Sequence, residues 1–245
     1  MQPMLLVLLS WIALGAGIVS SALIVVDTRV RGYRQPIKSE EFVWPVTGLY
    51  LGPAAVVAYR RWVRPHSRRW QQRNGRPPKR PRQIVILTGV CQCGAHCALG
   101  VILGEMVVFA GGIRLAGDTL WASYISDYLG AVVVGVTFRY FTSVRRGRLR
   151  MWDALVTVGK ADLLAVTSFE IALFVWLAFS HHVIAPEPPL NPTTPAFWFF
   201  IQIGLASGFI AAWPATSWLV RRGIKVMPWP APDGDKLRRR SQPQS

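Results

Sequence analysis

The sequence predicts an all-α fold, a polytopic membrane bundle of six transmembrane helices with both termini in the cytoplasm. Its 245 residues are 51% hydrophobic and only 16% charged, whereas about a quarter of the residues in an average soluble domain are charged. The mean hydropathy is +0.30. Lysine and arginine number 28 against 12 acidic residues, and they crowd into short stretches between long apolar runs. Membrane insertion imposes this distribution, whereas nucleic-acid binding needs a basic face. The composition therefore excludes an ordinary soluble domain.

Six apolar segments are candidate spans, because a helix needs about 20 residues to cross about 30 Å of hydrocarbon. They are residues 4–26, 42–59, 84–112, 120–143, 154–179 and 196–220. The first has no basic residue before it and is longer than the roughly 7–15 residues of a signal-peptide core, so we expect it to remain as a span. The second is the weakest, since it is short and contains Pro45, Gly48 and Pro53.

These spans divide the chain into four regions. We expect two N-terminal transmembrane helices in residues 1–59, a basic cytoplasmic loop in 60–83, a four-helix membrane domain in 84–225 and a disordered basic tail in 226–245. Four prolines between residues 65 and 81 favour a solvated loop over a regular helix in the second region.

The charges of the connecting loops predict which side faces the cytoplasm. With six spans, 22 Lys and Arg residues fall on the side of the 60–83 loop and five on the other side. This bias places the basic loop and both termini in the cytoplasm, with the protein in the inner membrane. If the second segment does not span, the N-terminus moves outside and the last four spans keep their orientation. The basic loop favours anionic lipid over nucleic acid as its partner.

Ionisable and amide side chains occur within the spans at an unusual frequency. A charge at the bilayer centre costs about 2.5–3.5 kcal/mol on insertion scales, so such groups usually face a cavity, a partner or a ligand. At about 1.5 Å of rise per residue, their depths indicate an outer layer of Glu105, Asp127, Glu170 and Gln202 and a deeper layer of His96, Lys160 and Asp162. The acids outnumber the ammonium groups, so some must be protonated, hydrated or neutralised by a bound cation.

Two interpretations of these layers remain open. The side chains could form a route for a proton or a metal ion, in which Lys160 is the counter-charge to an acid. They could instead form hydrogen bonds that hold the helices together, an interpretation that fits Gln202 best.

The three cysteines of the chain lie close together, and an odd, clustered set is not a disulfide framework. On a helix, Cys93, His96 and Cys97 stand at i, i+3 and i+4 and share one face, while Cys91 points away. Thiolates with an imidazole suit Cu(I) or Zn, although the spacing matches no standard zinc signature. The alternative is that small residues let helices approach closely. A redox thiol pair is less favoured, because the CxxC spacing is absent.

Several separated motifs carry a resemblance to a known family. They are Gly94-Ala95-His96-Cys97-Ala98-Leu99-Gly100 with Gly104-Glu105, then Asp127-Tyr128, Gly159-Lys160-Ala161-Asp162, and a last helix with Phe197-Trp198-Phe199, Gln202, Gly208-Phe209 and Pro214. Over about residues 84–225 the chain resembles the membrane family known as domain of unknown function 4396 (DUF4396). The resemblance implies a bacterial or archaeal membrane protein. Some members are attached to or neighbour copper-binding domains, which favours soft-metal handling, although this chain has no cupredoxin-like segment.

The expected function is therefore that of an integral membrane protein that binds or transports a metal cation, copper above all. His96, Cys97 and Cys93 would be the ligands of Cu(I) or Zn, and the acids would form the route. The alternative is a non-catalytic membrane scaffold or assembly partner, with a homo-oligomer or another membrane protein as its partner. An enzyme is least favoured, because no nucleophile and base pair is evident.

Overall fold

The regular structure of the chain is helical throughout the described part, which confirms the all-α prediction. The computed structural model describes residues 4–144, 151–184 and 191–224, with side chains except at 139–144 and 151–162. Within these residues, five helices are long and apolar enough to cross a membrane. They are α1 (Met4–Val25) continued by the wide turn η1 (Val26–Val30), α5 (Arg82–Gly111), α6 (Thr119–Val144), α7 (Met151–Phe179) and α8 (Pro195–Arg221).

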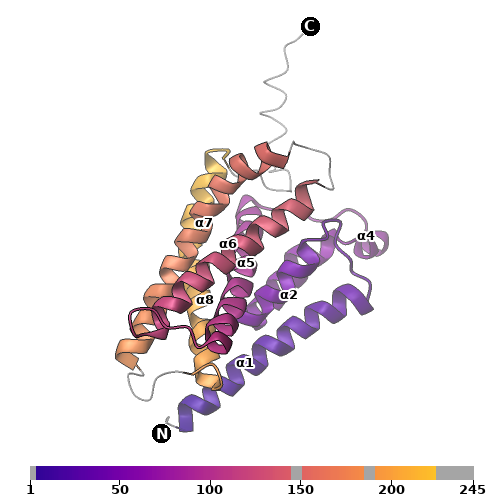
Figure 1. The fold of residues 1–245 in the computed structure, drawn as a ribbon. Helices are drawn as coiled ribbons and strands as arrows, with labels where there is room; N and C mark the ends of the chain where they lie inside the picture. Colours follow the sequence, from indigo (N-terminus) through magenta and orange to yellow (C-terminus); the bar gives the residue numbers. More distant parts are fainter. Residues whose placement is uncertain (1–3, 145–150, 185–190, 225–245) are drawn as a thin grey trace.

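The five long helices form one bundle and alternate in direction from α5 onward (Figure 1). One end, which we call the basic end, holds η1, the start of α5 and the end of α8. The opposite end holds the start of α1, the turn between α5 and α6, and the start of α8. Outward-facing apolar side chains such as Leu8, Ile12 and Ile18 of α1 are exposed, as a lipid-facing surface requires.

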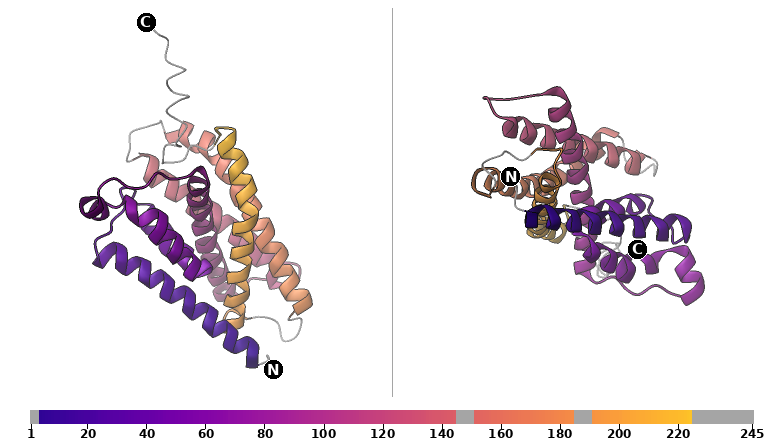
Figure 2. Two further views of the ribbon diagram at one scale, coloured as in Figure 1. Left: turned by 180° about the vertical axis from the view of Figure 1, so that it is seen from behind. Right: turned by 90° about the horizontal axis from the view of Figure 1, so that it is seen from below.

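Helix α5 lies at the centre of the bundle and packs against α2 (Glu40–Leu51), α6, α7 and α8 (Figures 1 and 2). Its approach to α6 depends on small residues. A Cβ added to Gly100 would overlap the backbone of Ala131, and one added to Gly104 would overlap the carboxyl of Asp127. Small residues at such positions let two helix backbones pack closely. In a membrane, where the hydrophobic effect does not drive helices together, the van der Waals contacts made in this way stabilise their association. The packing interpretation of the small residues therefore holds for this part of α5.

The segment 42–59, predicted as the second span, is two short helices instead of one long one. Helix α2 ends at Leu51, Gly52 has φ 55° and ψ −134°, and α3 (Pro53–Ala58) follows, continued by η2 (Tyr59–Val63). A positive φ is accessible to glycine at little cost, and proline at the first position of a helix needs no amide donor. Gly52 and Pro53 therefore break the helix where a continuous span was expected.

Interactions with the neighbouring helices show how deep this segment reaches. Near its tip, Leu49 accepts a hydrogen bond of 2.7 Å from Gln202 Nε2 of α8, and the same amide donates to Ala13 in the middle of α1 at 3.3 Å. At its far end, the Tyr59 hydroxyl donates to Asp27 Oδ2 at 3.2 Å, close to where α1 ends. Residues 40–63 thus enter from the basic end, turn near the middle and return to it. We call them the re-entrant hairpin.

The re-entrant hairpin changes the arrangement of the ends. Because it does not cross, the start of α1 and the end of α8 lie at opposite ends of the bundle (Figure 1), which does not fit the prediction of both termini on one side. The stretch from Arg29 to Lys38 lies at the basic end beside the 60–82 stretch. Among the Lys and Arg side chains that the structure describes, only that of Arg114 belongs to the turn between α5 and α6, which lies at the opposite end. The charge asymmetry is therefore stronger than six spans would give.

Ion pairs with buried carboxylates tie the hairpin and the basic stretch to the bundle. Asp27, which is 2% exposed, lies 3.1 Å from Arg64 and 3.5 Å from Arg31. Arg80 lies 3.5 Å from Glu40, and both side chains are buried. The stretch predicted as a solvated loop also contains the short helices η3 (Arg64–His66) and α4 (Arg68–Asn74). This stretch is therefore partly helical and packs against the bundle. The predicted disordered tail 226–245 lies outside the described residues.

Candidate functional site

Three carboxyl side chains from three helices are buried in the same part of the bundle. Glu105 of α5, Asp127 of α6 and Glu170 of α7 are 6%, 0% and 1% exposed. Asp127 interacts electrostatically with both of the others. The absence of a side chain at Gly104 allows α6 to bring Asp127 directly against α5. We call these three residues the carboxyl cluster.

The carboxyl cluster has few hydrogen-bond partners. The Ser123 hydroxyl donates to Glu105 Oε2 at 3.1 Å. Both Asp127 carboxyl oxygens are buried with no hydrogen-bond partner among the described side chains, and Glu170 has the thiol of Cys97 beside it. In the same part of the chain no Lys or Arg pairs with the cluster. Buried carboxylates need a proton, water or a cation in such surroundings, because desolvation of the bare charge is costly.

A cavity of about 360 Å³ leads toward the cluster from the opposite end of the bundle. Glu105 and Ser123 line it together with residues of the outer turn, among them Arg114 and His181. At its mouth, His181 Nε2 lies 3.9 Å from Asp118 Oδ2. The backbone amide of Leu120, and then His181, lower the pKa of the Asp118 carboxyl. The cavity thus presents an ionised carboxylate outside and a buried carboxyl inside.

The cysteines lie on the other side of the cluster, between Glu170 and the re-entrant hairpin. Cys97 has Cys93 and Glu170 as its neighbours. Tyr50 of α2 interacts with all three cysteines, and its hydroxyl lies directly against Gly94. All three thiols are buried. They therefore extend the polar interior from the cluster toward the hairpin.

This polar interior continues toward the basic end through the hairpin. Thr47 of α2 lies beside both Tyr50 and Cys91, and Cys91 interacts in turn with Glu40 at the start of α2. Glu40 pairs with Arg80. Polar groups therefore follow one another from the cavity at the opposite end to the basic end. We call this series the polar column.

His96 points away from the predicted thiol ligands. Its ring packs edge-on against Phe138 of α6, with ring centroids 4.8 Å apart, and lies next to Gly135. In the part of the chain that the structure describes, no three His, Cys, Asp or Glu side chains are placed so as to hold a metal ion. The structure thus brings Cys93 and Cys97 together but turns His96 toward α6. Metal binding by this set stays a prediction.

The other predicted site residues fall in two groups. Gln202 lies outside the carboxyl cluster and joins α8 to α1 and to the hairpin through its two hydrogen bonds. The side chains of Lys160 and Asp162 lie outside the described residues. The predicted outer layer is therefore the carboxyl cluster without Gln202.

Sequence reasoning missed five contributors to the polar column, namely Ser123, Tyr50, Thr47, Glu40 and Arg80. Ser123 stands four residues before Asp127, one helical turn away, so its position on the same face was available from spacing alone. Tyr50 and Thr47 were hidden because a continuous second span predicts no special position for them. The sequence Gly52-Pro53 was the signal that this span breaks.

The comparisons with known proteins agree with the family resemblance. The profile of the domain of unknown function DUF4396 matches residues 85–225, which include α6, α7, α8 and all of α5 except its first three residues. The chain belongs to this family. Neither the search of curated proteins nor that of solved structures found a match.

Proposed function

We propose that the chain is an integral membrane protein that binds a cation at the carboxyl cluster and passes it along the polar column. The observation that carries this proposal is the burial of Asp127 within electrostatic reach of the buried Glu105 and Glu170, without a basic partner in the described part. A carboxyl in a bilayer interior normally faces a ligand, a partner or a water-filled cavity.

The cavity at the opposite end gives the cluster access to one side. Glu105 forms part of its lining, so a cation that reaches the cavity meets a carboxyl without a further barrier of apolar side chains. On the other side, thiols and hydroxyls of α5 and the hairpin continue the series. Re-entrant segments are tolerated at membrane depth when protein or a cavity surrounds them, and this hairpin supplies Tyr50 and Thr47.

The proton is the cation that the described geometry fits best. A proton needs only neighbouring oxygen or sulfur atoms, whereas a metal ion such as Zn needs about four ligands at fixed distances. A transition metal ion, copper above all, remains the second cargo that we propose, because Cys93 and Cys97 lie together beside Glu170. Bound Cu(I) or Zn would then take these thiols and require His96 to turn away from Phe138.

The orientation that we propose follows from the charges. The basic end faces the cytoplasm, in an inner membrane, and the cavity opens to the outside. This places Met4 outside and Arg221 inside.

Flux into reconstituted vesicles tests the proposal. We expect vesicles that contain the wild-type protein to pass protons under a pH gradient, measured by an internal pH dye, or to take up Cu(I) or Zn, measured by an internal chelating dye. Asp127→Asn and Glu105→Gln preserve shape and remove the charge, and both should reduce flux to that of empty vesicles. Ser168→Ala is the control. Ser168 lies two residues from Glu170, but its hydroxyl donates a hydrogen bond to the Leu164 carbonyl of the same helix and takes no part in the cluster. Normal flux in both carboxyl variants would refute the proposal.

A scaffold is the second candidate, and a specific observation favours it. Several polar side chains do join helices: the Tyr124 hydroxyl donates to Phe174 at 2.9 Å, and Tyr128 lies 3.0 Å from Thr167. Such bonds stabilise helix association in membranes by about 1 kcal/mol each or less. A wild-type protein that passes neither protons nor metal ions in the vesicle experiment would support this candidate.

A further inference from the structure

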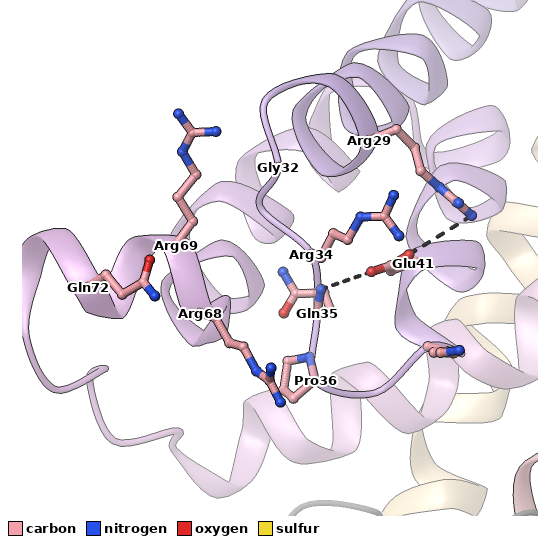
Figure 3. Close-up of a pocket in the computed structure, with 10 residues that line it drawn as sticks. Arg29, Gly32, Arg34, Gln35, Pro36, Glu41, Arg68, Arg69 and Gln72 are labelled. Atoms are coloured by element: carbon pink, nitrogen blue, oxygen red, sulfur yellow. Dashed lines mark hydrogen bonds and ion pairs between the residues drawn. The ribbon is translucent and has the colours of Figure 1, made fainter.

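A second cavity, of about 750 Å³, lies at the basic end, and Figure 3 shows the residues that line it. Its walls come from two segments that are far apart in the sequence, the connection between η1 and α2 and the helix α4. Its volume falls within the range of about 300–1,000 Å³ of pockets that bind small molecules. It has five basic side chains against one carboxylate in its lining, namely Arg29, Arg34, Lys38, Arg68 and Arg69 with Glu41.

The two walls are held in place by interactions that leave most of this charge unused. Arg69 donates to the Arg31 carbonyl at 2.6 Å, and Arg64 stacks on the Tyr33 ring at 3.9 Å. Gly32, with φ +71°, lets the connection pass close under Arg69. The Glu41 carboxylate accepts a hydrogen bond of 3.2 Å from the backbone N–H of Gln35 and lies 3.9 Å from the Arg29 guanidinium. The pocket is therefore built from both segments.

Three of the basic side chains in the pocket have no described partner. Arg34, Lys38 and Arg68 are exposed, and within the described residues none of them takes part in an ion pair or hydrogen bond. Like charges gathered in one cavity repel one another, so an anion that enters relieves this repulsion. Arginine in particular binds phosphate through paired N–H donors.

The position of the pocket indicates where the anion comes from. Arg29 is followed directly by Val30, which is 77% exposed, and Val25 and Val26 are exposed on the same end of α1. Such apolar side chains face lipid, so the pocket opens at the depth of the lipid headgroups. Basic pockets beside transmembrane helices on the cytoplasmic side are suited to anionic headgroups. The amide side chains of Gln35 and Gln72 also line the pocket and suit hydroxyl groups.

We propose that this pocket binds a polyol phosphate, presented as the headgroup of an anionic phospholipid such as phosphatidylglycerol. Arg34, Lys38 and Arg68 hold the phosphate. This site is independent of the carboxyl cluster and of any flux through it.

Lipid binding to the purified full-length protein tests the proposal. The dissociation constants of phosphatidylglycerol and phosphatidylcholine are measured in detergent at high salt, where attraction between distant exposed charges is screened. The pocket variant combines Arg34→Gln, Lys38→Gln and Arg68→Gln. The matched control combines Arg73→Gln, Arg76→Gln and Lys79→Gln, which removes the same charges from the same basic stretch but outside the pocket lining.

We expect the wild type and the control to bind phosphatidylglycerol at least about tenfold more tightly than phosphatidylcholine, and the pocket variant to lose this preference. Equal losses in both variants would overturn the proposal, because they would show general attraction to the basic stretch. Competition by soluble glycerol phosphate identifies the source. Displacement of the lipid supports recognition of the headgroup, whereas binding of glycerol phosphate without any lipid preference would overturn the membrane source. Arg34→Gln alone keeps the test valid if the triple variant does not fold.

Discussion

Asp127 of α6 lies so close to Gly104 of α5 that a Cβ on Gly104 would overlap its carboxyl oxygen. The glycine therefore does more than let two backbones approach. It leaves the space in which a fully buried carboxyl faces Glu105, one residue further along α5, and Glu170 across the bundle. Close helix packing and the carboxyl cluster thus depend on the same residue.

This contact makes Gly104→Ala a destabilising substitution. The added methyl group has to push α6 and Asp127 outward, and such overpacking typically costs about 1–3 kcal/mol. We expect a lower unfolding temperature in detergent, measured by the loss of the monodisperse peak in size-exclusion chromatography after heating. Gly15→Ala is the matched control, because a Cβ there meets nothing within 4 Å. Equal unfolding temperatures for both variants would contradict the close contact.

The re-entrant hairpin predicts where the connection after α1 is accessible. With five spans in the orientation that we propose, residue 34 is expected in the cytoplasm, whereas six spans would place it outside. A cysteine introduced by Arg34→Cys should therefore resist a membrane-impermeant maleimide in intact cells and react after permeabilisation. Leu5→Cys should show the reverse, since it lies at the opposite end. The native cysteines are buried and add no background. Labelling of residue 34 in intact cells would contradict the re-entrant hairpin and support a second span.

Asp27 is expected to anchor the hairpin. Its carboxylate is buried against Arg64, Arg31 and the Tyr59 hydroxyl, so Asp27→Asn leaves the Arg64 charge without its partner. Removal of one partner of a fully buried pair costs about 3 kcal/mol. Because the Arg64 side chain is 28% exposed, we expect a smaller cost here, above about 1 kcal/mol. Arg29→Gln, which breaks only the contact of an exposed guanidinium with Glu41 at 3.9 Å, should cost less than about 1 kcal/mol. Thermal unfolding in detergent compares the two, and a similar small effect of both would exclude the anchoring role.

His66 is expected to make folding sensitive to acid. Burial, and then the neighbouring Arg80 guanidinium, lower the pKa of His66 from 6.5 to about 4. The unfolded chain therefore takes up this proton at a higher pH than the folded chain does. Stability should fall as the pH drops from 6.5 toward 4 and should lose nothing further from this group below that. His66→Asn should flatten part of the decline in unfolding temperature between these pH values. An unchanged slope would show that His66 does not contribute.

The long helices could be predicted from the sequence because each is apolar all round over more than 20 residues, a pattern that only a membrane span or a deeply buried helix shows. The segment 42–59 was different. Its apolar residues fit a short span as well as a hairpin, and the choice depends on contacts of Leu49 and Tyr59 with distant parts of the chain. Contacts with residues so far away in the sequence cannot be predicted from the local composition of the segment.

The candidate site was predictable to a similar degree. Depth along each helix brings Glu105, Asp127 and Glu170 to one level, because rise per residue is fixed. Rotation about each helix axis is set by packing against neighbours, and it separates Gln202 from the carboxyl cluster and turns His96 toward Phe138. Helical spacing placed Cys93, His96 and Cys97 on one face. That face is wide enough to contact two neighbours, so the cysteines lie beside Glu170 of α7 while His96 packs against Phe138 of α6.

Infrared difference spectroscopy of the purified protein tests most directly whether the carboxyl cluster takes up a cation. Carboxyl stretching bands shift when a buried carboxylate binds a proton or a metal ion. We predict that a change of pH, or addition of Cu(I) or Zn, gives difference bands of buried carboxyl groups in the wild type, and that Asp127→Asn removes some of them while the protein stays folded. Identical difference spectra of the two proteins under every one of these conditions would contradict a cation site at the cluster.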